Sequence, residues 1–199
     1  MIRKGQGVVL IGCGILRKEF NLLPKRITDR FRPQFLDSML HMKPALLEET
    51  LQSLIRKKTG DPIVYLYGDC CPGMEALSSE ADRSRTKGVN CIEICLGRES
   101  YRTLRREGTF FLMPEWARRW KEIFQQELGF ESSASTRDFL RSSMKKALYL
   151  DTGTEPVPEA DLAEFAEYTG LPVTVIKVGM EHLQEALQQA LQKLEGIHG

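Results

Sequence analysis

The sequence predicts an α/β fold: a mostly parallel sheet built from βαβ units, with helices on both faces. Short runs of β-forming residues alternate with helix-length amphipathic segments along the chain, which is the pattern of βαβ units. The runs at 8–11 and 63–66 are continuously apolar, as is typical of parallel strands buried on both faces. The chain has 199 residues, so we expect a single domain over residues 1–199, with a loop or linker at 129–135.

Strands are predicted where β-forming runs end in turn residues. Residues 8–12 close in Gly-Cys-Gly, and residues 62–67 (PIVYLY) stop at Gly68. The other predicted strands are residues 34–40, 87–90, 109–113, 147–151 and 173–178.

Helices are predicted from apolar residues spaced three and four apart. The segment 44–58 is the clearest, because Pro44 suits the first turn and Gly60 follows the end. The other predicted helices are residues 15–23, 72–83, 101–106, 115–127, 136–146, 159–168 and 181–194.

Composition argues against several classes of protein. The net charge is +1, which gives no general attraction to nucleic acid. No apolar stretch approaches the ~18 residues of a membrane span, and the first residues do not resemble a signal peptide. We therefore expect a cytoplasmic protein without a nucleic-acid or membrane partner. In a reducing compartment the five cysteines are core residues, metal ligands or reactive thiols rather than a disulfide framework.

Three cysteines follow three of the predicted strands. They are Cys13, Cys70 and Cys91, and ligands of open α/β sheets bind at the carboxyl ends of the strands. If the strands are neighbours, the thiols converge, and a cation such as zinc or the irons of a cluster compensates their charge. Each cysteine also precedes a predicted helix, whose N-terminus is expected to lower the thiol pKa. The alternative is that these cysteines are buried core residues.

The two other cysteines have different settings. Cys71 can replace Cys70 as a ligand or add a fourth thiolate. Cys95 lies in an apolar run, where packing is the default interpretation, although it shares a helix face with Cys91 if the segment is helical.

Two further residues are candidates for cofactor binding. His41 lies in a predicted turn near a strand end and either completes a Cys₃His zinc site or is a solvent-facing loop residue. Arg17 follows Cys13 and either lies on a helix surface or meets an anionic ligand.

Short motifs are spread over residues 8–153: GCGILRxE (12–19), LHxxP (40–44), YGxC (67–70), NCI (90–92), LGxxxY (96–101) and LxxDTG (148–153). Together they resemble the domain-of-unknown-function family numbered 1638, found in anaerobic bacteria and archaea. The resemblance implies three shared cysteines, which map to Cys13, Cys70 and Cys91. It also implies a genomic setting beside corrinoid-dependent methyltransferases and corrinoid proteins. Asn90 departs from the family pattern, which has an acidic residue there, and Cys71 and Cys95 are additional.

The leading functional hypothesis is a three-cysteine site at the carboxyl edge of the sheet that holds a [4Fe–4S] cluster or zinc. One coordination position would stay open for a small-molecule ligand, in a protein of corrinoid-dependent one-carbon metabolism.

The alternative is a non-catalytic binding or accessory module for a corrinoid protein or a methyltransferase. The corrinoid signature Asp-x-His-x-x-Gly is absent, which argues against corrinoid binding through an axial histidine. A third interpretation is an α/β domain with buried thiols and no metal. The sequence predicts no substrate and no oligomeric state, and both an enzyme and a non-catalytic protein fit it.

Overall fold

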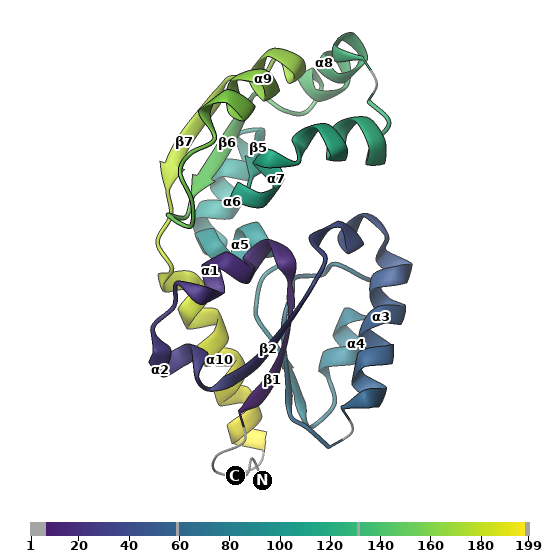
Figure 1. The fold of residues 1–199 in the computed structure, drawn as a ribbon, viewed down its shortest axis with the longest axis vertical. Coiled ribbons are helices and arrows are strands. Elements are labelled where there is room, and N and C mark those ends of the chain that lie inside the picture. The colour runs from purple at the N-terminus through teal and green to yellow at the C-terminus, as the bar shows by residue number, and fades with distance from the viewer. Residues whose placement is uncertain (1–6, 59, 131, 198–199) are drawn as a thin grey trace. The chain divides into compact units, whose positions relative to one another are not determined.

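The computed structural model describes residues 7–58, 60–130 and 132–197. Contacts divide the chain into two compact units, Met1–Gly97 with Met180–Gly199 and Arg98–Gly179, and each described unit has its own parallel sheet (Figure 1). The predicted α/β class is confirmed, with the described strands divided between two sheets. One domain over residues 1–199 stays a prediction, because two compact units can belong to one domain or to two.

The sheet of the first unit carries the predicted cysteine turns. Its strands are β1 (Val8–Cys13), β2 (Phe31–Leu36), β3 (Ile63–Leu66) and β4 (Arg83–Arg85), in the order β2-β1-β3-β4 with every neighbouring pair parallel. Every residue of β1 and β3 is buried. This burial explains why both strands read as unbroken apolar runs, since central parallel strands are covered on both faces.

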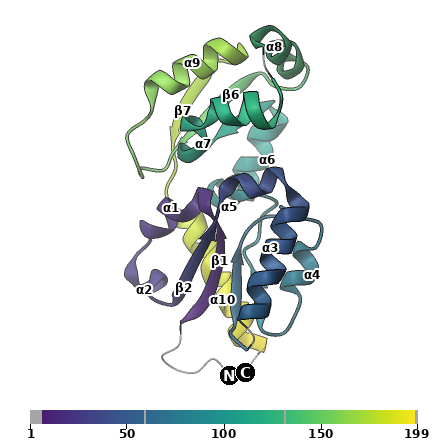
Figure 2. The same cartoon turned by 45° about the vertical axis from the view of Figure 1, so that its right-hand side comes forward.

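Helices cover the two faces of this sheet. The helix α10 (Glu181–Ile197) contacts β3, β4 and α5 (Cys91–Leu96), while α3 (Pro44–Lys57) and α4 (Met74–Ser78) lie on the opposite side (Figures 1 and 2). The remaining helical segments of this unit are η1 (Gly14–Leu16), α1 (Arg17–Asn21), α2 (Lys25–Thr28) and η2 (Ser38–Met42).

The second unit is built around three parallel strands in the order β5-β6-β7. Their bounds are Thr109–Leu112, Lys146–Asp151 and Val173–Lys177. The helical segments are α6 (Arg98–Arg106), α7 (Pro114–Arg118), the π-helical turn η3 (Glu122–Glu127), α8 (Ser133–Arg141) and α9 (Glu159–Thr169).

An aromatic cluster forms the core of the second unit. The ring of Phe165 on α9 contacts those of Phe110, Trp120 and Phe124 at centroid distances of 5.4–5.8 Å. The next residue of β5, Phe111, contacts Tyr101 on α6 at 5.6 Å. Because neighbouring strand residues point to opposite faces, helices cover both faces of this sheet too.

Several element boundaries differ from the predictions. The strand β4 lies at Arg83–Arg85, at the end of the predicted helix 72–83, and not at 87–90. Its sequence Arg-Ser-Arg has no β-type signal, and it is a strand because it pairs with β3. The strand β2 begins three residues before the predicted 34–40 and gives way to η2, where the Asp37 side chain accepts a hydrogen bond from Met39 N (2.9 Å).

Helix boundaries of the second unit also differ. The predicted helix 115–127 divides into α7 and the π-helical turn η3. In the predicted loop 129–135, Ser132 caps α8, which begins at Ser133, while Glu131 lies outside the described residues. Among the helices of the described ranges, none combines the length and apolar character needed to cross a membrane.

The turns at the carboxyl edge of the first sheet approach one another closely. A methyl group at Gly68, after β3, would lie 2.4 Å from backbone atoms of Val89 and Asn90, which precede α5. In the same place Asp69 N donates a hydrogen bond to Val89 O (2.9 Å). A methyl group at Gly14 would lie 2.6 Å from Leu36 O at the end of β2. Glycine is therefore required where these turns touch, since backbone cannot yield as a flexible side chain can.

We predict that Gly68→Ala destabilises the protein by about 1–3 kcal/mol, because the added methyl group forces two packed backbone segments apart. Gly196→Ala is on α10, where no atom of the described residues lies within 4 Å of the added carbon apart from the chain neighbours and the backbone of the same helix. It should leave the free energy of unfolding unchanged or raise it by up to about 1 kcal/mol. Urea unfolding followed by circular dichroism measures both. Equal effects of the two substitutions would contradict the close approach at Gly68.

Candidate three-cysteine site

Three turns bring Cys13, Cys70 and Cys91 to one edge of the first sheet. Cys13 is the last residue of β1, Cys70 lies four residues beyond β3, and Cys91 begins α5 after β4. Since β1, β3 and β4 are parallel neighbours, their carboxyl ends meet at the same edge. The predicted convergence of the three turns is therefore present in the fold, although β4 precedes the segment first expected to form the strand.

The three thiols interact with one another. The side chains of Cys13 and Cys91 share a hydrogen bond, and both are within electrostatic range of Cys70. Cys13 is 4% exposed and Cys91 is 9% exposed, whereas Cys70 is only partly buried. Of the three cysteines, Cys70 is therefore the one that solvent reaches most easily.

The surroundings of the thiols favour their protonated form. The hydrogen bond with Cys13, burial and the charges of neighbouring thiolates raise the pKa of Cys91 well above its ordinary value. Burial, followed by the charge of Cys13, raises the pKa of Cys70 to about 11. The sequence predicts that helix N-termini lower these pKa values. For Cys91, on the first turn of α5, desolvation and neighbouring sulfur outweigh that effect.

The turn that carries Cys91 is fixed by a reciprocal cap. The Asn90 side chain accepts a hydrogen bond from Glu93 N (2.9 Å), and the Glu93 carboxylate accepts one from Val89 N (3.3 Å). The arrangement differs from a capping box only in that the Glu93 carboxylate accepts from the N–H of the residue before the N-cap and not from that of the N-cap itself. Asn90, which departs from the expected acidic residue, thus serves as the N-cap of α5, a role that an aspartate performs equally well.

Tyr67 is part of the cluster, although the sequence predicts no role for it. Its hydroxyl donates a hydrogen bond to the carbonyl oxygen of Gly12 (3.2 Å), directly before Cys13. The residue is 1% exposed, and burial together with the charges of Cys13 and Cys91 raises its pKa. The hydroxyl therefore ties the turn after β3 to the end of β1. Its sequence signals are its position at the end of the apolar run 62–67 and its place in the YGxC motif (67–70).

The remaining cysteines occupy two different environments. Cys95 is fully buried on α5, and burial and the charge of Glu19 raise its pKa, as fits the predicted packing role. Cys71 is 6% exposed. Burial and the charge of Glu48 raise its pKa, and the Gly73 N–H hydrogen bond opposes this. Cys71 thus faces α3 rather than the Cys13–Cys91 pair.

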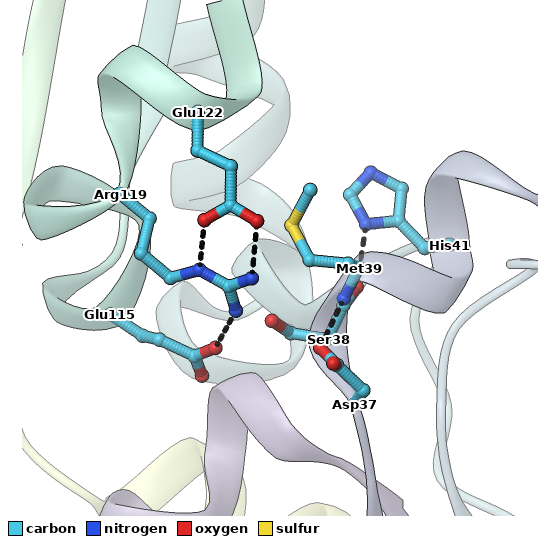
Figure 3. Close-up of polar contacts among 7 residues, drawn as sticks. All are labelled: Asp37, Ser38, Met39, His41, Glu115, Arg119 and Glu122. Atoms are coloured by element: carbon cyan, nitrogen blue, oxygen red, sulfur yellow. Dashed lines mark hydrogen bonds and ion pairs between the residues drawn. The ribbon is translucent and has the colours of Figure 1, made fainter. Parts of the chain in front are cut away.

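His41 lies on η2, which follows β2. Its Nδ1 is 3.2 Å from Ser38 O, and burial lowers its pKa, which favours the neutral imidazole (Figure 3). Its predicted part in a Cys₃His site stays a prediction.

Arg17 extends from α1 over β2. Its guanidinium lies 5.7 Å from the ring centroid of Phe35 and donates a hydrogen bond to Phe35 O (3.4 Å). This stacking matches the helix-surface interpretation, and its predicted binding of an anion stays a prediction.

Figure 3 also draws an ion-pair cluster of the second unit. Arg119 donates two hydrogen bonds of 2.8 Å to Glu122 and one of 3.2 Å to Glu115. These pairs link the end of α7 to the π-helical turn, where the predicted continuous helix is interrupted.

Within residues 7–58, 60–130 and 132–197, no group of three or more His, Cys, Asp or Glu side chains lies so that it could hold a metal ion. Of the three thiols, those of Cys13 and Cys91 share a hydrogen bond, and Cys70 interacts with them electrostatically.

Comparison with protein families adds one finding. A family described as "Protein of unknown function (DUF1638)" matches residues 35–187. The chain belongs to this family. The DUF1638 match confirms the resemblance inferred from the motifs; it contains Cys70 and Cys91 and begins after Cys13. No curated protein matches the chain, and neither does any solved structure.

We predict that Tyr67→Phe lowers the free energy of unfolding by about 1–2 kcal/mol, because a buried carbonyl group loses its donor. Tyr65→Phe is the matched control: Tyr65 lies two residues earlier, on β3, is fully buried, and its hydroxyl has no hydrogen-bond partner within the described part of the chain. Its removal should be neutral or stabilising. Urea unfolding compares the two, and a larger loss for Tyr65→Phe would exclude an anchoring role for Tyr67.

Proposed function

We propose that this DUF1638 protein binds a metal centre, a [4Fe–4S] cluster or zinc, through Cys13, Cys70 and Cys91. The observation that carries the proposal is the convergence of three thiols from three separate strand ends, with Cys13 and Cys91 hydrogen-bonded and Cys70 within electrostatic range of both.

The donor set fits the proposed group. Thiolates are the preferred ligands of iron–sulfur clusters and of zinc. Without a cation, the same proximity disfavours the charged form of each thiol, as the raised pKa values of Cys70 and Cys91 indicate. A bound metal removes this penalty, because it deprotonates the thiols that ligate it. A bound centre held by three protein ligands supplies a Lewis-acidic position for a fourth, exchangeable ligand.

The chain's own residues would shape such a site. Tyr67 holds the backbone before Cys13, and the Asn90–Glu93 cap holds Cys91 at the start of α5. The burial of Cys13 and Cys91 excludes water from the inner side. Cys70 is the ligand on the accessible side.

The first test is the metal and sulfide content of protein purified without oxygen. We expect about four irons with matching sulfide per chain, or about one zinc. Cys13→Ser, Cys70→Ser and Cys91→Ser should each lower the metal affinity at least about tenfold, since losing even an outer-shell partner costs about 10–100-fold.

Cys71→Ala and Cys95→Ala are the matched controls, and we expect both variants to retain the metal. Circular dichroism establishes that every variant is folded. A wild-type protein without iron or zinc, or an equal loss of metal in the Cys95→Ala variant, would refute the three-cysteine site.

We further propose that the site serves corrinoid-dependent one-carbon metabolism, with an accessory module for a corrinoid protein or a methyltransferase as the alternative to a methyl-transfer enzyme. The support is family membership together with the genomic setting that the resemblance implies. Because the Asp-x-His-x-x-Gly signature is absent, cobalamin added to the pure protein should keep its free absorbance spectrum. A spectral shift would instead identify the protein as a corrinoid carrier.

A further inference from the structure

A pocket opens beside Cys70, on the accessible side of the three-cysteine site. Its volume is about 540 Å³, which is sufficient for a small organic molecule. Its lining comes from the start of α3, the turn after β3 and the first turn of α4, and consists of Pro44, Asp69, Cys70, Cys71, Pro72, Met74 and Glu75. Cys70 therefore belongs to both features: it interacts with Cys13 and Cys91, and it also forms part of the pocket wall.

The charged side chains that line this pocket are acidic. Asp69 and Glu75 contribute carboxylates, and none of the described lining residues is Lys, Arg or His. Arg85 pairs with Asp69 and offsets one negative charge, whereas Glu75 is exposed on the first turn of α4. A third carboxylate, Glu48, lies behind the wall, where it accepts a hydrogen bond from Gly73 N (3.2 Å).

The wall also contains a thiol that the three-cysteine site does not use. Cys71 is 6% exposed overall, yet it lines the pocket. Its electrostatic neighbours are Glu48 and Arg85. A molecule that occupies the pocket can thus contact both Cys70 and Cys71, because both line its wall.

We propose that this pocket binds a small organic cation, such as a protonated primary amine, and excludes anions from the Cys70 side of the site. The inference rests on the proposed function, to which it adds a substrate class. In water, one carboxylate about 5 Å away favours a unit cation about fourfold and disfavours an anion by the same factor. The carboxylate of Glu75, which Arg85 does not offset, should therefore give a cation-to-anion preference of about tenfold or more. Salt should weaken this preference.

Cys71 reports this selectivity directly. Aminoethyl methanethiosulfonate is a cation and sulfonatoethyl methanethiosulfonate is an anion of similar size. Each transfers its alkylthio group to the cysteine sulfur: a new S–S bond forms, the S–S bond of the reagent breaks, methanesulfinate leaves, and the thiol proton passes to the buffer. The modified residue is identified by mass spectrometry of proteolytic fragments of the anaerobically purified protein, and each rate is divided by the rate of that reagent with 2-mercaptoethanol.

We expect the cationic reagent to modify Cys71 at least about tenfold faster than the anionic one after this normalisation, with the ratio falling at high salt. Glu75→Gln should lower the ratio several-fold. Glu181→Gln, an exposed residue of α10 that does not line the pocket, should leave it unchanged. Ethylammonium chloride should also slow the reaction of Cys71 with uncharged iodoacetamide, relative to sodium chloride at the same ionic strength.

Equal normalised rates, a faster anionic reagent or the absence of protection by ethylammonium would each overturn the proposal. So would a Cys71 that reacts with neither reagent in the folded protein but reacts after denaturation. Metal content measured on the same samples separates this proposal from the preceding one. Charge selectivity without metal would refute only the three-cysteine centre, and bound metal without selectivity would refute only the cation pocket.

Discussion

The backbone hydrogen bonds that pair β1 in parallel with β3 direct both strands toward the same edge of the sheet. The pairing of β4 with β3 adds a third strand end there. Everything at the candidate site depends on this arrangement, because the cysteines are separated by 20 residues or more in the sequence and have no local reason to meet. Parallel pairing also buries β1 and β3 completely, so the edge where the thiols gather is supported by the best-packed part of the first unit.

Close contact between turns converts this shared edge into a cluster of interacting side chains. Gly68 and Gly14 permit backbone approaches that any side chain would block, and the Tyr67 hydroxyl bridges from the turn after β3 to the end of β1. These contacts bring the cysteine thiols together at an edge of the sheet from which water is largely excluded. Thiolates there repel one another and lack water, so the protein without a metal favours the protonated thiols. A soft cation reverses that preference, which is the physical reason for proposing one.

The cluster has an inner and an outer side. Cys13 and Cys91 are buried and hydrogen-bonded, while Cys70 lies between them and a pocket whose wall also includes Cys71. The buried and the accessible residues of the site are therefore expected to have different roles. In the function proposed above, the inner thiols would hold a centre in place, and the carboxylates that line the pocket would determine which charges can approach it. The pairing of Asp69 with Arg85 lowers the negative charge at the rim without removing it, because Glu75 lies on the adjacent turn.

The sequence by itself determined the α/β class, the main strands and helices, and the membership in DUF1638. Apolar runs such as 63–66 and the Pro44 helix start are local signals, because burial on both faces of a strand and first-turn geometry depend on nearby residues alone. It also indicated that Cys13, Cys70 and Cys91 belong at strand ends. Tertiary structure alone decided that Arg83–Arg85 forms a strand. Its residues have no preference for β structure, and backbone pairing with β3 stabilises the extended conformation. Tertiary structure likewise decided the bridging role of Tyr67, the raised thiol pKa values and the pocket at Cys70. These depend on which turns become neighbours and how much water is excluded between them, and no pattern of nearby residues encodes such long-range contacts.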